Sequence, residues 1–109
     1  MSKTLFGTVD ITLDGETYTL KPTLGAVRTI EAHFGGLRGA SQALNALSID
    51  GCAVIIAGGA GLTGKAAEAV AGQVWQAGVI DVSIQLNAYL AALYNPKGPD
   101  AGKEKPAAA

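Results

Sequence analysis

Two alternating segments joined by Asp14-Gly15 form the strongest structural pattern in this chain. Residues 5–13 read LFGTVDITL and residues 16–22 read ETYTLKP, so that large apolar residues recur at alternate positions. A period of two is typical of a strand that is buried on one face. Asp-Gly is a preferred pair for a two-residue hairpin turn, because that turn needs positive φ angles. Pro22 lacks the N–H of a strand ladder, so the sequence predicts a β-hairpin over residues 5–22.

Helical spacing replaces this alternation after the hairpin. Residues 24–34 carry Leu, Val, Ile and Phe at helical spacing, between Thr23, a candidate N-cap, and Gly35-Gly36, a typical helix stop. A two-stranded hairpin alone is marginally stable in water. We therefore expect this helix to pack its apolar stripe against the hairpin.

The following residues are predicted to be mainly helical, with one ambiguous segment. Residues 37–47 and 63–77 show helical spacing, and a last helix is expected over residues 81–95 with Asp81 as its cap. Residues 52–57, CAVIIA, suit either a helix capped by Asp50 or a buried strand, because periodicity does not distinguish the two over so short a run. The glycines that follow are expected to interrupt whichever element forms.

Together these elements predict an α+β fold in one domain over residues 1–95. The N-terminal hairpin, residues 5–22, is expected to pack on a bundle of about four short helices within residues 23–95. Residues 96–109 are rich in Pro, Gly, Ala and Lys without apolar periodicity, which is typical of a disordered tail. A chain of 109 residues has room for one such domain.

Composition disfavours several classes of protein. The net charge of −1, from 8 Lys+Arg and 9 Asp+Glu, argues against nucleic-acid binding. The sequence has neither the run of roughly 18 apolar residues that a membrane span requires nor a secretory signal, so a cytoplasmic protein without membrane contact is expected. With one histidine and Cys52 as the single cysteine, neither a metal site nor a Cys–His catalytic pair is expected. We expect no enzyme activity and no cofactor.

A glycine-rich run offers an alternative. Residues 58–66, GGAGLTGKA, match the G-x-x-x-x-G-K pattern of a phosphate-binding loop from Gly59 to Lys65. Position 66 is Ala, however, so the hydroxyl that would hold magnesium is missing. The chain also has room for only one βαβ unit beside the hairpin, whereas dinucleotide sites use a larger sheet. Because of these two departures, a small nucleotide-binding domain that uses the loop from Gly59 to Lys65 is kept only as an alternative function.

The second half of the chain is poor in charge. Residues 39–96 contain four charged residues, and a domain this small exposes much of its surface. Such a surface favours contact with another protein or with further copies of this chain. The residues predicted to form a partner-binding surface, which the same pattern would also allow in the core, are Leu44, Leu47, Val74, Trp75 and Tyr89.

The opening hairpin and helix also carry a family resemblance. The matching features are a strand ending in Leu-Asp-Gly, an aromatic residue and a leucine on the second strand, a Leu-Gly-Ala helix start, and an Ile-Glu pair before a glycine. These features are Leu13, Asp14, Gly15, Tyr18, Leu20, Leu24, Gly25, Ala26, Ile30, Glu31 and Gly35. In these residues, and more loosely over 5–93, the chain resembles the small tail assembly chaperones of phages and gene transfer agents.

This resemblance implies a role in virion morphogenesis within the bacterial host cytoplasm. Such chaperones coat the long helical tape-measure protein and recruit tail-tube subunits around it, so the implied partners are the tape-measure protein and the tail tube protein. Some members of the family are described as tube proteins instead, and a tail-tube subunit is the second hypothesis. Because a tube subunit usually has a larger sheet, one hairpin with several helices favours the chaperone.

Overall fold

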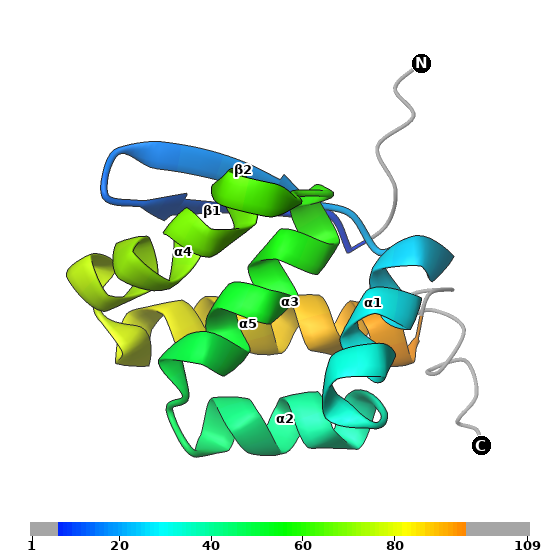
Figure 1. The fold of residues 1–109 in the computed structure, drawn as a ribbon. Helices are drawn as coiled ribbons and strands as arrows, with labels where there is room; N and C mark the ends of the chain where they lie inside the picture. Colours follow the sequence, from blue (N-terminus) through cyan, green and yellow to red (C-terminus); the bar gives the residue numbers. More distant parts are fainter. Residues whose placement is uncertain (1–6, 96–109) are drawn as a thin grey trace.

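The computed structural model describes residues 7–95, which form an antiparallel hairpin followed by helices (Figure 1). In chain order the elements are β1 (Val9–Leu13), β2 (Glu16–Leu20), α1 (Leu24–Phe34), α2 (Leu37–Asn45), α3 (Ile49–Ala60), α4 (Gly64–Ala77) and α5 (Val79–Tyr94). This arrangement confirms the predicted α+β fold, with five helices in the described part of the chain. The predicted tail, residues 96–109, and the first two residues of the predicted hairpin lie outside the described residues.

The hairpin forms as its alternation predicts. Asp14 and Gly15 join the antiparallel strands with φ angles of 49° and 88°, the positive values that a tight two-residue turn requires. The inner face of the hairpin presents Ile11, Leu13 and Leu20, whose side chains are completely buried. The alternation therefore sets which face of the sheet meets the helices.

Both predicted ends of α1 are confirmed. The Thr23 hydroxyl accepts a hydrogen bond from the Ala26 backbone N–H at 3.1 Å, which satisfies one of the free donors at the start of the helix. Gly35 ends the helix at a φ of 81°, and its N–H donates to the Glu31 carbonyl at 2.7 Å.

The ambiguous segment is helical, as part of α3. Ser48 caps this helix in place of Asp50: its hydroxyl accepts a hydrogen bond from the Gly51 N–H at 2.9 Å, whereas Asp50 lies in the first turn. A carboxylate in the first turn still stabilises a helix, because it faces the positive end of the helix dipole.

The expected interruption is wrong at Gly58 and Gly59, through which α3 continues, and is confirmed at Gly61, which ends the helix at a φ of 74°. At Gly59 the helix approaches two other elements closely. A Cβ there would lie 2.8 Å from the Tyr89 hydroxyl and 3.0 Å from the Leu20 Cβ. Glycine has a low helix propensity, but the tertiary packing at this position leaves no room for a Cβ, so only glycine fits there.

The last helix begins two residues earlier than predicted, at Val79. Gly78, with a φ of 103°, both ends α4 and starts α5, and the two helices bend by 119° relative to each other. Asp81 lies in the first turn of α5 and is not its cap. The inner face of α5 consists of five apolar residues at helical spacing, all of them buried: Val82, Leu86, Tyr89, Leu90 and Leu93.

Helix α3 is the central element of the fold. It runs between α1 and α4 and in front of α5 in Figure 1, and it contacts β2 and each of the other four helices. The core lies around it and combines the inner face of the hairpin with apolar residues from all five helices. An apolar helix buried on most sides suits the CAVIIA run, which has no polar face.

Candidate partner-binding surface

Three of the five residues predicted to form a partner-binding surface are buried instead. Leu44 is 1% exposed, and Val74 and Tyr89 are 0% exposed. Their helices turn these positions toward the core, so this part of the predicted surface is wrong. Leu47 and Trp75 do lie on the surface, with exposed fractions of 42% and 66%.

Two large apolar residues that the sequence analysis missed are exposed on α5. Ile80 and Ile84 lie one helical turn apart and have exposed fractions of 59% and 64%. Their exposure could have been predicted from their spacing to the inner face. Ile80 and Ile84 each lie two positions before an inner residue, Val82 and Leu86 respectively, and residues two apart fall on opposite sides of a helix.

Trp75, Ile80 and Ile84 lie on either side of the turn at Gly78, and we call these three residues the α4–α5 corner. Asp81 is exposed between Ile80 and Ile84, and beyond Ile84 the exposed side of α5 continues without a charged residue, through Asn87, Ala88 and Ala91. Large apolar side chains exposed on a surface with so few charges are typical of contact sites for other proteins. No single helix within residues 7–95 is long and apolar enough to cross a membrane, and α4 and α5 meet that test only as a bent pair, on length and composition.

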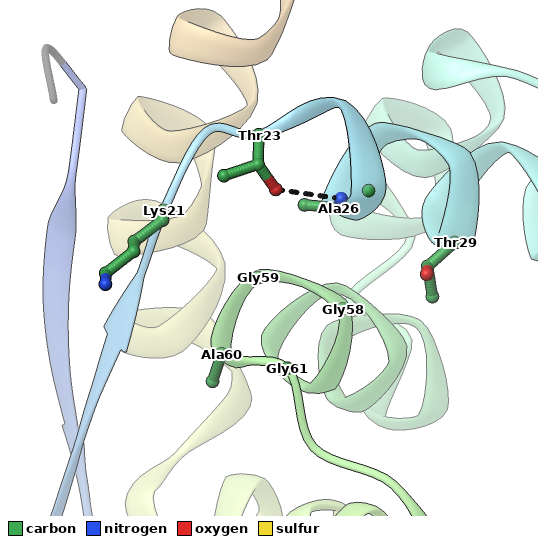
Figure 2. Close-up of a pocket in the computed structure, with 9 residues that line it drawn as sticks. Lys21, Thr23, Ala26, Thr29, Gly58, Gly59, Ala60 and Gly61 are labelled. Carbon is green, nitrogen blue, oxygen red and sulfur yellow. Dashed lines mark hydrogen bonds between the residues drawn. The ribbon is translucent and has the colours of Figure 1, made fainter.

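The glycine-rich run covers the last turn of α3, the short connection at residues 61–63 and the first turn of α4, and it does not follow a strand. The segments that the nucleotide-binding hypothesis needed as strands are α3 and the start of α5, which removes its structural context. Figure 2 shows the hollow of about 380 Å³ beside the run, between the end of β2, the start of α1 and the last turn of α3. The Gly59 carbonyl already accepts a hydrogen bond from the Lys21 N–H at 3.1 Å. Lys65, the lysine of the motif, is exposed in the first turn of α4 and does not line this hollow.

The two side chains with the most reactive chemistry, those of Cys52 and His33, lie apart on α3 and α1. Cys52 is buried, its sulfur lies 3.5 Å from the Ser83 hydroxyl, and burial raises the pKa of its thiol. His33 lies on α1 with its ring edge-on to Phe34, at 4.7 Å between ring centres. Within the described residues no group of three or more His, Cys, Asp or Glu is placed to hold a metal ion.

A second hollow, of about 440 Å³, lies between α1, α3 and α4. Its lining is mostly alanine and valine, with three titratable residues. We call it the α3 groove, and its residues are His33, Asp50, Ala53, Val54, Ala57, Ala67, Glu68 and Ala71. These residues come from three helices whose arrangement only the fold determines, so no pattern in the sequence indicates that they share a surface.

The buried Tyr89 gives a testable pH dependence. Its hydroxyl donates to the Lys21 carbonyl at 2.6 Å, and burial raises the pKa of the phenol from 10.0 to about 12. From about pH 10 the unfolded chain loses this proton while the folded chain keeps it, so the stabilising effect present below pH 10 is lost as the pH rises toward 12. We expect urea unfolding to show that the stability advantage of the natural chain over Tyr89→Phe shrinks across this range. Parallel pH profiles for the two proteins would contradict the assignment.

The comparisons with known proteins add no relative. No protein-family model, curated protein or solved structure matches this chain. We therefore infer the function of this protein from its own residues and from the surfaces that the fold creates.

Proposed function

We propose that this chain is a tail assembly chaperone of a phage or gene transfer agent, which binds the tape-measure protein in the host cytoplasm and helps recruit tail-tube subunits. The observation that carries the proposal is the α4–α5 corner. Trp75, Ile80 and Ile84 are each more than half exposed, and beyond Asp81 the exposed side of α5 carries no charge. Exposing them to water is unfavourable, and a partner with an apolar helical stripe would cover them.

The resemblance of the hairpin and first helix supports the same function. The resembling residues lie in the first part of the chain, in the hairpin and α1, whereas the corner lies in α4 and α5. Strand β1 contacts both α4 and α5, so the proposal is of a binding protein whose hairpin supports the helices that carry the corner. It does not involve catalysis or a cofactor.

Reversible coating sets a limit on how strongly each copy should bind. A chaperone that gives way to tube subunits needs modest affinity per copy, and many copies along one tape-measure chain then act together through avidity. A small corner with one tryptophan suits this requirement, because a few aromatic and aliphatic residues usually carry most of the energy of an interface. The same exposed residues would also allow the chain to self-associate.

The test is co-expression with the tape-measure protein encoded in the same gene cluster, followed by affinity purification and light scattering. We expect soluble complexes that contain several copies of this chain per tape-measure chain. Ile84→Lys should reduce the co-purified amount by about tenfold, because it places a charge inside the apolar contact. Thermal unfolding should show an unchanged fold.

Leu24→Lys is the matched control for this variant. Leu24 is as exposed as Ile84, at 64%, but lies at the start of α1, outside the corner. It should leave co-purification unchanged. Equal losses from both variants, or no complex with the natural chain, would contradict the proposal. Rings or tubes of the purified chain in electron microscopy would support the tail-tube subunit instead.

A further inference from the structure

The α3 groove is a hollow lined mainly by small apolar side chains of two neighbouring helices. Its floor is formed by Ala53, Val54 and Ala57 of α3, and Ala67 and Ala71 of α4 line one side. Because these side chains are small, another helix could approach α3 closely between α1 and α4, at the usual interaxial distance of about 8–10 Å. The arrangement of the three helices is visible in Figure 1.

The charge at the rim of the groove has one sign. Asp50 lies in the first turn of α3 and Glu68 in the first half of α4, and both carboxylates are exposed. Neither has an ion-pair partner among the residues that the structure describes. His33 is the third titratable residue of the lining, and within residues 7–95 no lysine or arginine lines the groove. A ligand that brought cations to this rim would meet two unpaired carboxylates.

We propose that the α3 groove binds an amphipathic helix of a partner protein, one that presents small apolar residues flanked by lysine or arginine. The apolar residues enter between α1 and α4, and the basic side chains pair with Asp50 and Glu68. Apolar burial supplies the affinity, while the charges select the partner and its orientation. An acidic helix of the same shape is rejected, because it would place like charges together at the rim.

The inference rests on the proposed function only for the identity of the partner. If that function is correct, basic, alanine-rich stretches of the tape-measure helix are the segments that enter the groove. The groove is formed by residues separate from the α4–α5 corner. The two surfaces can therefore be tested independently with variants of the full chain.

The experiment measures binding of two fluorescently labelled helical peptides by anisotropy. Both peptides carry the same alanine and leucine stripe; one has lysines beside it and the other has glutamates. We expect the lysine peptide to bind with an affinity that falls as salt is added, and the glutamate peptide to bind at least about tenfold more weakly. Glu68→Gln should weaken the lysine peptide by a few fold and reduce its salt dependence, whereas Glu31→Gln, on α1 outside the groove, should have no effect.

Filling the groove gives the decisive comparison. Ala71→Gln places a longer side chain in the groove and should weaken the lysine peptide by about tenfold. Ala69→Gln is the matched control, since Ala69 is an exposed residue of the same helix outside the groove. Equal affinity for both peptides, equal effects of Ala69→Gln and Ala71→Gln, or no binding of the lysine peptide would overturn the inference.

Two further outcomes separate the groove from other occupants and from the proposed function. A dimer of the free chain that Ala71→Gln disrupts and Ala69→Gln does not would assign the groove to a second copy, which also overturns the inference. Binding of the lysine peptide without co-purification of the tape-measure protein would support the groove and contradict the proposed function. Co-purification of the tape-measure protein that depends on Ile84, without binding of the lysine peptide, would support the proposed function and contradict the binding role of the groove.

Discussion

Tyr89→Ala should lower the free energy of unfolding by about 3–5 kcal/mol, the range typical of removing a large buried aromatic side chain. The tyrosine ring is completely buried, and its hydroxyl donates to the Lys21 carbonyl at the end of β2. The substitution leaves a cavity beside α3 and removes a hydrogen bond that ties α5 to the hairpin. Urea unfolding followed by circular dichroism measures the change.

Trp75→Ala is the informative comparison, because both residues belonged to the partner-binding surface that the sequence predicted. Since the tryptophan is about two-thirds exposed, its replacement should change stability by no more than about 0.5 kcal/mol. It should nevertheless reduce co-purification of the tape-measure protein. A large loss of stability in Trp75→Ala, or a small loss in Tyr89→Ala, would contradict their assignment to surface and core.

Gly59→Ala should destabilise the protein by about 2 kcal/mol, although alanine is the better helix former. The added Cβ would lie 2.8 Å from the Tyr89 hydroxyl, which is closer than real Cβ atoms approach their neighbours, and 3.0 Å from the Leu20 Cβ, which is tighter than most real Cβ contacts. Tyr89 is held by its hydrogen bond, and Leu20 belongs to a strand. Neither can move aside without disturbing the hairpin or α5.

Gly72→Ala provides the control of opposite sign. Gly72 lies in the middle of α4, and a Cβ there would have no neighbour within 4 Å. The same substitution should therefore stabilise the protein, by about 0.5–1 kcal/mol, through the loss of backbone freedom in the unfolded chain. Thermal unfolding of the two variants should show shifts in opposite directions. A stabilising Gly59→Ala would mean that α3 does not pack tightly against β2 and α5.

Local features of the chain predicted much of the fold. The hairpin followed from period-two alternation and Asp14-Gly15, and α1 followed from Thr23 and Gly35, because these signals act within a few residues. Element boundaries were less accurate where a cap was misassigned. Ser48, not Asp50, caps α3, and α5 begins directly after Gly78, because the glycine allows an abrupt turn between two helices.

The candidate surfaces were harder to predict than the elements. Helical spacing identifies an apolar stripe, but it does not say whether a given leucine or tyrosine of that stripe is covered. Leu44, Val74 and Tyr89 are covered by other helices, and Trp75 is not. The α3 groove brings together residues from α1, α3 and α4, so no sequence spacing indicates it.

The fold class, the hairpin with its turn and the ends of the first helix could be predicted from the sequence, because turn chemistry, alternation and capping depend on neighbouring residues. The packing of the whole domain was needed to show that CAVIIA is a helix, that Gly59 belongs inside it, and which apolar residues remain exposed. These outcomes depend on contacts between segments far apart in the chain. For a short apolar run, such contacts outweigh the weak preferences of the individual residues.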